Sequence, residues 1–440
     1  LQTSVTSSPY SALGHSAIKR SNQIYATQSM MLTLILAVLW AGPTSVYTHE
    51  LPQFDSRFNN DIVLTKEQMI MMRSTFSYVP DKWPMKDGVA TIPYYINESI
   101  PEGDLRTNFK RAASVFENFT CIKWVPTTKD HVGIKVFVYQ GSQFHDCNSN
   151  LGYLGKTDTK INLSPGCEAV DIIFHEMMHA VGVIHTQSRP DRNQFVKIWS
   201  NYMPPEANSN YDIFTGYNVY DIPYDYQSIM HYTSYANSKN GSYPMTPTEP
   251  YAMFKMGSEV YRWSDIAFVN KGYSCTRTFL KQCKALNCQN AGYVGKDCKC
   301  RCPENTEGDL CERTTGPLFS YTPPCSRVIN KTSVISHGYA QGSISYACVF
   351  KIEAPTCQKP QITILSMKLE ASTPFSMIAL QVSKRYFGYY FYNDTTVPIG
   401  QVFTSDSSSA AVYFYTDTKG LPQYGFNASI DFTPDASCLP

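Results

Sequence analysis

The sequence predicts an α+β domain, then a small disulfide-rich module, then an all-β sandwich. Three observations predict this order. Helical and strand periodicities alternate up to about residue 275, six cysteines crowd into the next stretch, and short alternating strands separated by turn residues fill the remainder. A chain of 440 residues is long enough for two to four domains.

The composition limits the compartment and the partners. Lysine and arginine number 37 against 36 acidic residues, so no bulk charge favours nucleic acid or a membrane surface as a partner. Fourteen cysteines in spaced clusters indicate disulfides formed in an oxidising compartment. Sequons for N-glycosylation are spread along the chain and agree with secretion. These candidate sites are Asn97, Asn118, Asn162, Asn240, Asn330, Asn393 and Asn427.

An apolar run near the start of the sequence predicts a signal peptide. Residues 31–41 are too short a run to span a bilayer and fit a signal-peptide core, so we assign residues 30–47 to a signal peptide and expect no stable membrane insertion. We interpret residues 1–29 as a non-native extension, because we expect translation to start at Met30 or Met31. The alternative is a long basic n-region that gives a signal anchor.

Periodicity predicts the elements of the first domain. Residues 104–119 place their apolar side chains on a helical period, which predicts a long helix behind the sheet. The apolar residues on that face are Leu105, Phe109, Ala112, Ala113 and Phe116. We expect strands at residues 92–96, 122–125 and 132–138, and an edge strand above the cleft at residues 161–164.

The chemistry-bearing stretch runs from His175 to His185. His175 and His179 are four residues apart on a predicted buried helix, so both imidazoles can reach one metal ion, with Glu176 beside it. Gly182 predicts the end of the helix, after which the chain can bring His185 back. Three neutral imidazoles and an open fourth position are typical of a catalytic zinc site. The alternative is a buried helix whose three histidines are ordinary core residues.

This run resembles the metzincin zinc proteases. Ser228-Ile229-Met230-His231-Tyr232 resembles the Met-turn of the astacin family, in which the methionine lies under the zinc site, and Arg189-Pro190-Asp191-Arg192 fits the astacin extension. The resemblance covers residues 83–275. It implies a mixed, mostly parallel sheet with a backing helix and an active-site helix.

The resemblance also assigns roles to side chains. It implies one zinc ion bound by His175, His179 and His185, with Tyr232 as a movable fourth ligand that hydrogen-bonds the oxyanion, and Glu176 as the general base. We therefore expect a secreted endopeptidase that cuts proteins, with extracellular matrix or cuticle proteins as possible substrates. The alternative is a catalytically silent matrix-binding scaffold. The intact base and tyrosine argue against that alternative, and a non-peptide metallohydrolase is a third possibility.

A segment before the catalytic domain resembles an astacin propeptide. In residues 48–73, Phe58-Asn59-Asn60-Asp61 resembles the motif Phe-x-Gly-Asp, which implies that Asp61 binds the zinc of the zymogen. The alternative is a polar loop with a stray aspartate. Arg73 offers a basic cleavage point, so we expect the mature enzyme to begin at Ser74.

One departure from the family concerns the mature N-terminus. The third histidine is usually followed by a glutamate that anchors this terminus, but here Thr186 follows it. We expect activity to survive, because the zinc ligands and the base are intact. We expect the terminus near Ser74 to be held less firmly.

The cysteines divide into three groups. For Cys121, Cys147, Cys167 and Cys275, spacing alone allows three connectivities. The resemblance implies that Cys121 pairs with Cys275 and Cys147 with Cys167.

Residues 279–313 resemble an EGF-like module, with a zinc cluster as the alternative. Its expected pairs are Cys283–Cys298, Cys288–Cys300 and Cys302–Cys311. This module follows a catalytic domain that we place at residues 74–278.

The last region resembles a CUB domain. After a linker at residues 314–324, residues 325–440 show repeated short strands that predict a β-sandwich, for which a generic sandwich is the alternative. The expected pairs are Cys325–Cys348 and Cys357–Cys438. Only Asp406 matches a family calcium ligand, so we expect no calcium here.

Overall fold

The computed structural model describes residues 57–58, 61–75, 78–239, 242–283, 286–323, 325–338, 346–368, 377–383, 389–392, 395–416 and 425–438. The predicted extension at 1–29, the signal peptide at 30–47 and the sequons at Asn240 and Asn393 lie outside these residues. Within the described ranges, no helix is long and apolar enough to cross a membrane.

The first domain is built on an eight-stranded mixed sheet, which confirms the predicted α+β class. The strand order is β1-β2-β7-β8-β6-β4-β3, with β5 paired to β4. The strands are β1 (Arg57–Phe58), β2 (Ile62–Val63), β3 (Met85–Lys86), β4 (Val89–Ile96), β5 (Ile122–Pro126), β6 (Val136–Tyr139), β7 (Cys147–Asn150) and β8 (Thr159–Leu163). The pairs β4/β5, β4/β6 and β6/β8 are parallel, whereas β7 runs antiparallel to β8.

Two strand predictions need correction. The prediction that residues 161–164 form the edge strand is wrong, because β7 pairs with β8 on its outer side. The sequence of β7, Cys-Asn-Ser-Asn, has no apolar alternation that could predict a strand. The strand predicted from Val132 begins only at Val136, because Gly133 has a φ of 121° and Val132 is 96% exposed.

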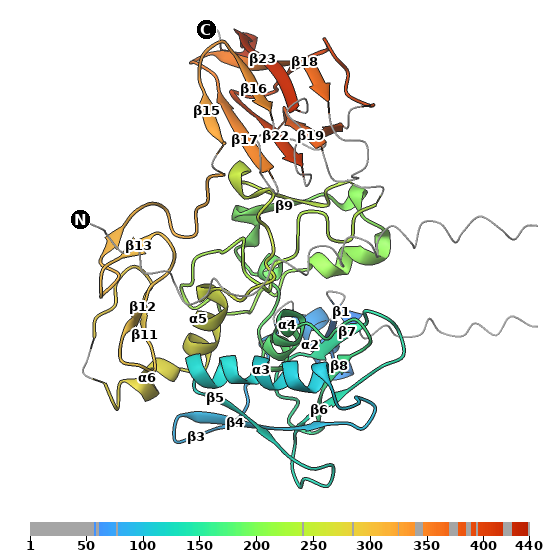
Figure 1. Ribbon diagram of the computed structural model, residues 1–440, viewed down its shortest axis with the longest axis vertical. Helices are drawn as coiled ribbons and strands as arrows, with labels where there is room; N and C mark the ends of the chain where they lie inside the picture. The colour runs from blue at the N-terminus through green and yellow to red at the C-terminus, as the bar shows by residue number, and fades with distance from the viewer. Residues whose placement is uncertain are drawn as a thin grey trace, which may run out of the picture. The chain divides into compact units, whose positions relative to one another are not determined.

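The predicted backing helix is confirmed at its bounds and on its buried face. Helix α3 (Asp104–Phe119) buries the five apolar residues that the periodicity predicts. It lies beside α4 (Val170–Ala180) (Figure 1). The rings of Phe116 in α3 and Phe174 in α4 are 4.9 Å apart. Full burial of one such side chain contributes roughly 1.5–3 kcal/mol. Packing against α3 therefore holds α4, the helix that carries His175 and His179, rigidly in the domain.

Two disulfides secure this domain at the ends of its elements. Cys121, just before β5, is joined to Cys275, and Cys147, at the start of β7, is joined to Cys167. The second bond ties the outer antiparallel strand to the chain that leads into α4. A disulfide stabilises a fold by typically 2–4 kcal/mol.

Of the remaining helices, α2 precedes α4, and the others and a small two-stranded sheet follow it. The α-helices are α2 (Lys66–Thr75), α5 (Trp263–Gly272) and α6 (Cys275–Phe279). The 3₁₀ helices are η1 (Thr186–Ser188), η2 (Arg192–Gln194), η3 (Ser200–Tyr202), η4 (Pro205–Tyr211), η5 (Pro250–Ala252) and η6 (Ala436–Cys438). Strands β9 (Val196–Ile198) and β10 (Met245–Pro247) pair antiparallel in the region after the third histidine.

The disulfide-rich module contains two short antiparallel pairs. These pairs are β11 (Tyr293–Val294) with β12 (Cys300–Arg301), and β13 (Thr306–Glu307) with β14 (Arg313–Thr314). Its disulfides are Cys283–Cys298, Cys288–Cys300 and Cys302–Cys311, the same pairs that the resemblance implies. So short a segment cannot bury a large core, so covalent bonds take over part of the stabilisation.

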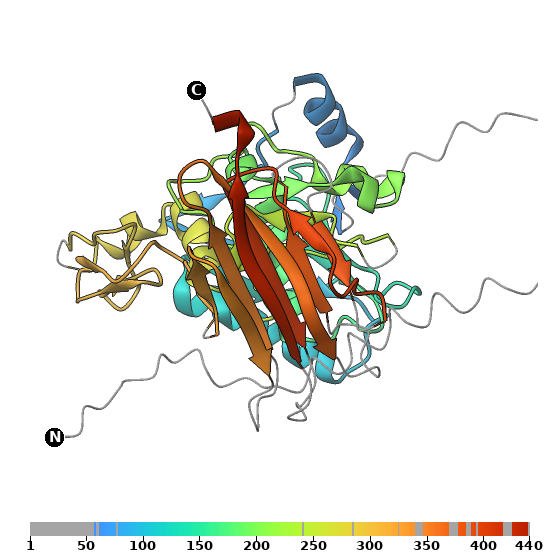
Figure 2. The ribbon, with the colours of Figure 1, turned by 90° about the horizontal axis from the view of Figure 1, so that it is seen from above.

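The C-terminal region is a two-sheet sandwich, as predicted. One sheet has the order β15-β17-β22-β19-β20 and the other β16-β23-β18-β21; Figure 2 shows the orange and red strands side by side. The strands are β15 (Arg327–Ile329), β16 (Ser333–Gly338), β17 (Tyr346–Glu353), β18 (Gln358–Lys368), β19 (Met377–Gln381), β20 (Tyr389–Tyr392), β21 (Val402–Thr404), β22 (Ser409–Thr416) and β23 (Gly425–Pro434). The disulfides Cys325–Cys348 and Cys357–Cys438 match the expected pairs.

Candidate metal centre

Helix α4 positions the first two histidines because its other faces are buried. Ile173, Phe174 and Met177 belong to the core of the domain and leave His175 and His179 on one shared face. The helix ends at Ala180, whose carbonyl accepts a hydrogen bond from the indole Nε1 of Trp83, 2.9 Å away. This bond satisfies one of the carbonyls that a helix end leaves free.

Gly182 reverses the chain after the helix, as predicted. Its φ is 91°, a conformation that L side chains rarely adopt, and its N–H donates to the carbonyl of His179 at 2.8 Å. Val183 N–H then donates to the carbonyl of Met178 at 2.9 Å. The chain turns back through these bonds and brings His185 to the face of α4.

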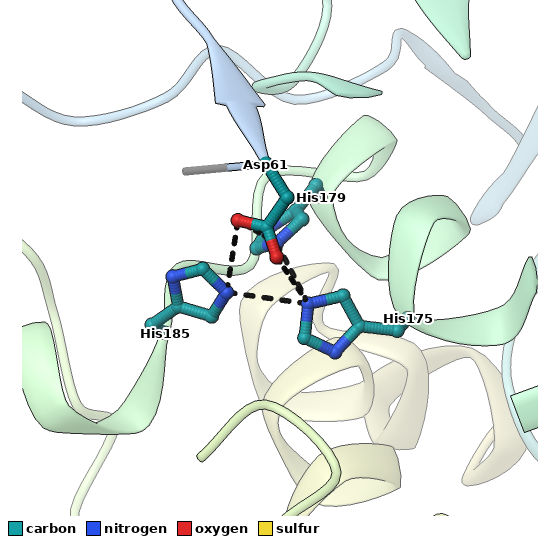
Figure 3. Close-up of side chains that lie close together, drawn as sticks. All are labelled: Asp61, His175, His179 and His185. Atoms are coloured by element: carbon teal, nitrogen blue, oxygen red, sulfur yellow. Dashed lines mark hydrogen bonds and ion pairs between the residues drawn. The ribbon is translucent and has the colours of Figure 1, made fainter. Parts of the chain in front are cut away.

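The three histidines converge through their Nε2 atoms. Nε2 of His175 lies 3.2 Å from Nε2 of His185 and 3.1 Å from Nε2 of His179 (Figure 3). The Nδ1 atoms of His175 and His179 point away, to the carbonyls of Ile229 at 2.9 Å and Val183 at 2.7 Å. A carbonyl partner requires an N–H at Nδ1, which leaves the Nε2 lone pair free for a metal.

Asp61 is the fourth member of the group. Its Oδ2 lies 3.3 Å from Nε2 of His175, and its Oδ1 lies 3.2 Å from Nε2 of His185 and 3.7 Å from Nε2 of His179. All four ligand atoms lie within 4.8 Å of one another. Three imidazoles and one carboxylate are a donor set that zinc prefers.

Two buried oxygen atoms support a cation at this place. Oε2 of Glu176 is buried and has no hydrogen-bond partner among the described residues, and the buried Oδ1 of Asp61 faces the Nε2 atoms of His185 and His179, the same atoms that could bind a metal. A buried carboxylate oxygen is costly unless a cation, a donor or a proton compensates it. The residues therefore fit a zinc ion held by His175, His179 and His185.

The electrostatics of the centre favour the metal-binding form for three of the four ligands. The exception is His175: burial lowers its pKa, but its hydrogen bond to Asp61 and the charge of Asp61 outweigh this and raise the pKa above its usual value. Burial lowers the pKa of His179 well below its usual value, and the charges of His185 and His175 lower it further. Burial also lowers the pKa of His185. Although burial raises the pKa of Asp61, the histidines outweigh it and hold that pKa well below its usual range. Neutral imidazoles and an ionised carboxylate are the ligand forms that a metal needs.

The pKa of Glu176 shifts in the opposite direction from that of Asp61. Burial raises its pKa well above the usual value, and the charges of Asp61 and Asp146 raise it further. A glutamate whose pKa moves towards neutrality is suited to accept and return a proton. Removal of Asp61 from the centre would remove one of the causes of this shift.

The segment that carries Asp61 is fixed as an additional strand of the sheet. β2 runs parallel to β7, and Ser149 N–H donates to the carbonyl of Asp61 at 2.8 Å. Asn150 Nδ2 donates to the carbonyl of Val63 at 2.7 Å, and the side chain of Ile62 is fully buried. This docking places the carboxylate at the histidines. Asn60, which replaces the family glycine, lies outside the described residues.

Helix α2 continues this docked segment. The amide Nε2 of Gln68 donates to the hydroxyl of Tyr78 and, at 3.0 Å, to the carbonyl of Leu151. The cleavage point predicted after Arg73 falls inside this helix, which extends to Thr75.

The Met-turn residues lie directly behind the centre. Met230 is buried, and its carbonyl accepts a hydrogen bond from Thr186 N–H at 2.8 Å. The ring of Tyr232 lies against that of His185, with 4.6 Å between the ring centroids. His231 Nδ1 contacts the carbonyl of Tyr232 at 2.6 Å, and its Nε2 contacts the hydroxyl of Tyr224 at 2.8 Å.

Thr186, where the family has glutamate, belongs to a buried hydrogen-bond chain. Its hydroxyl donates to Oγ of Ser228 at 3.0 Å, and Ser228 donates to Oδ1 of Asp265 at 2.5 Å. Oδ2 of Asp265 accepts from Ile229 N–H at 3.2 Å and from Arg262 N–H at 2.7 Å. The threonine therefore connects the third histidine to the Met-turn and to α5.

Sequence reasoning missed several supporting residues. Asp265 and Gln187 carry no motif of their own, and only their positions beside the Met-turn and the third histidine could have pointed to them. The motif contains Arg189 and Asp191, but nothing in the sequence indicates their bidentate pair, which has contacts of 2.9 and 2.7 Å. Arg189 is almost fully buried, so this pair braces the chain beneath the centre.

One glycosylation candidate must be withdrawn. Asn162 is only 3% exposed, and its Nδ2 donates to the carbonyl and to Oδ2 of Asp146 at 2.7 and 3.1 Å. N-glycosylation would attach a glycan to this nitrogen, and the fold leaves no space for one. Asn118, Asn330 and Asn427 are exposed, and Asn97 is partly exposed.

The mixed sheet, the histidine helix and the glutamate beside the ligands define a zinc-hydrolase type of domain. Residues 77–274 match the family Astacin (Peptidase family M12A), and this part of the chain belongs to the astacin family.

Two curated proteins and one solved structure are similar to this chain. The chain is 28% identical over 399 residues to protein SpAN of Strongylocentrotus purpuratus. The matched region covers 84% of this chain and 62% of SpAN. It is 32% identical over 210 residues to the astacin-like metalloendopeptidase of Coturnix japonica, which covers 47% of this chain and 49% of that protein. High choriolytic enzyme 1, a hatching enzyme zinc-protease from Oryzias latipes, is 30% identical over 44% of this chain and 94% of that chain, with a TM-score of 0.40. The chain thus spans less than two thirds of the length of the curated relatives named here.

Proposed function

We propose that this protein is a secreted zinc endopeptidase that is made as a zymogen. The observation that carries the proposal is the convergence of three histidine Nε2 atoms beside Glu176, with the carboxylate of Asp61 in the fourth position. Membership of residues 77–274 in the astacin family supports the same reaction. Protein substrates are the class that such an enzyme hydrolyses.

The side chains divide the work of peptide hydrolysis. His175, His179 and His185 would hold a zinc ion, which when bound acidifies water and polarises a carbonyl group. Glu176 would take a proton from the attacking water and return it to the leaving amine. Tyr232 would donate a hydrogen bond to the oxyanion, a contribution that reaches about 10²–10³ in kcat for donors of this kind.

Latency would come from the docked segment before the domain. Asp61 contacts the same histidine Nε2 atoms that would bind the metal, so it competes for the position that water needs. The pairing of β2 with β7 fills the outer edge of the sheet at the same time. Cleavage followed by release of this segment would open both places.

The C-terminal modules would position the enzyme rather than take part in the chemistry. The three disulfides of the small module support an EGF-like assignment, and the two-sheet sandwich supports a CUB domain. Sequons and disulfides support secretion. Matrix or cuticle proteins are the substrates or partners that we propose for these modules to reach.

The test compares the chain processed after Arg73 with two variants of the same chain. We expect the processed wild type to degrade a denatured protein mixture. Glu176→Ala should lower this activity by a factor of about 10²–10⁴. Glu206→Ala removes an exposed carboxylate and should match the wild type. Zinc content is measured for each protein. If the processed wild type binds zinc and cuts nothing, the proposed activity is wrong and the scaffold alternative takes its place.

A further inference from the structure

Gln187 is a fully buried amide close to the metal centre. It lies two residues after His185, in the 3₁₀ turn η1. Its Oε1 accepts a hydrogen bond from the main-chain N–H of Tyr232 at 3.0 Å. Its Nε2 has no hydrogen-bond partner among the described residues. A buried unpaired donor costs roughly 1–3 kcal/mol. Packing alone therefore does not explain a glutamine at this position.

The orientation of this amide follows from its partner. The main-chain nitrogen of Tyr232 is a donor, so the oxygen of the Gln187 amide must face it, and the NH₂ group must face the other way. The bond to Tyr232 therefore fixes the orientation of the amide, and the unpaired Nε2 of Gln187 does not result from exchanging its nitrogen and oxygen.

The bond belongs to a short set of contacts between two segments. Thr186 N–H donates to the carbonyl of Met230 at 2.8 Å, and the next contact joins Gln187 to Tyr232. One segment follows directly on His185 and the other is the Met-turn. These two bonds fix the separation between the third histidine and Tyr232.

The ring of Tyr232 packs against two other rings. One neighbour is His185, at 4.6 Å between ring centroids, and the other is Tyr211, at 5.8 Å and nearly perpendicular. Tyr211 is itself fixed, because its hydroxyl donates to the carbonyl of Ala236 at 2.6 Å. Because both rings pack against that of Tyr232, a small shift of the Tyr232 main chain would tilt or displace the phenol relative to the histidines.

We propose that Gln187 is a positioning residue that sets the place of the Tyr232 phenol relative to the three histidines by holding the main-chain nitrogen of Tyr232. This inference rests on the proposed function, in which Tyr232 donates a hydrogen bond to the oxyanion. Gln187 acts through Tyr232 and touches no reacting atom. Misplacement of a reacting group by about 1 Å can cost up to about 10²-fold in rate.

The test is a double-mutant cycle on the processed chain. Gln187→Met removes the acceptor and keeps the size of the side chain, and Tyr232→Phe removes the phenol hydroxyl. We expect Gln187→Met to lower kcat between about tenfold and about 10²-fold while KM stays within about twofold, and to have no further effect in the Tyr232→Phe background. If the two effects multiply instead, Gln187 does not act through Tyr232 and the inference is wrong.

A matched control separates positioning from stability. Asn270 is also a fully buried amide with one hydrogen bond, from its Nδ2 to the carbonyl of Phe119 at 2.9 Å, and with an unpaired atom, its Oδ1. Asn270→Leu should lower the melting temperature without a loss of kcat that depends on Tyr232. Gln187→Leu replaces Gln187→Met if the latter does not fold.

A second readout needs no activity. In the zinc-free protein, amide hydrogen exchange at Tyr232 should be slow in the wild type and in Asn270→Leu, and fast in Gln187→Met. Unchanged protection in Gln187→Met would contradict the inference. If Tyr232→Phe leaves kcat unchanged, the inference fails while the peptidase activity stands, and if the wild type cuts nothing, the proposed function itself fails.

Discussion

Asp61 and His185 meet at 3.2 Å, from Oδ1 to Nε2, although one lies in the segment before the catalytic domain and the other lies beyond the active-site helix. The same carboxylate reaches His175 at 3.3 Å. The chain therefore supplies from its own sequence the fourth group at a centre that has three histidines. The first prediction follows from this contact.

Asp61→Ala should relieve latency in the uncut chain. Without the carboxylate, water can reach the place that Asp61 occupies, so hydrolysis of a quenched peptide should rise at least about tenfold over the uncut wild type. Asp81→Ala, which changes an exposed aspartate in the same region, serves as the control. An Asp61→Ala chain that stays silent until it is cut would show that the β2–β7 pairing suffices for latency.

Removal of the metal should lower both activity and stability. A chelator should abolish hydrolysis and lower the melting temperature of the catalytic domain, and added zinc should restore both, because ligand binding to the folded state adds to its stability. His179→Ala should bind zinc at least about tenfold more weakly, whereas His131→Ala, a partly exposed histidine, should bind it normally. Equal zinc content in the two variants would contradict the assignment of the ligands.

Asp265 should make stability depend on pH in the acid range. Burial raises the pKa of this carboxyl from 3.8 to about 6. Between these values the folded state binds more protons than the unfolded state, so the contribution of Asp265 to stability falls as the pH rises from about 4 to about 6. The total change is roughly 3 kcal/mol.

The measurement is the difference in unfolding free energy between the wild type and Asp265→Asn across that range. The asparagine does not titrate, so the variant should gain relative to the wild type as the pH rises. A difference that is constant with pH would show that the carboxyl is not perturbed in the folded protein.

Asn162 should carry no glycan and should still be needed for stability. Its amide accepts from Gly141 N–H at 2.8 Å and donates to Asp146, so Asn162→Gln should leave the glycan mass of the secreted protein unchanged and lower its melting temperature. Asn330→Gln, at an exposed sequon, should leave the melting temperature unchanged. A fall in glycan mass for Asn162→Gln would contradict the buried position of this side chain.

Periodicity and motif spacing predicted the elements that depend on local sequence. Helix α3 shows its amphipathic pattern in the order of its residues, and Gly182 marks the end of α4 because few other residues adopt that backbone conformation. The three histidines were found for the same reason, since their spacing and a glycine are visible in the chain.

Elements that depend on tertiary pairing could not be predicted in this way. β7 has a polar sequence and exists because β8 and β2 pair with it on either side. Gln187 and Asp265 act through hydrogen bonds between segments far apart in the chain, and no local pattern marks such residues. Family resemblance suggested Asp61, but its contacts with the histidines could be seen only in the folded arrangement.

The position of β7 at the outer side of the sheet gives the released enzyme two opposed properties. Once β2 departs, β7 offers an unsatisfied row of main-chain donors and acceptors. An extended peptide of almost any sequence can add to such a row, which favours broad recognition of unfolded proteins. The same row could also pair with a second copy of the enzyme, so release of the segment would create a site for self-association as well.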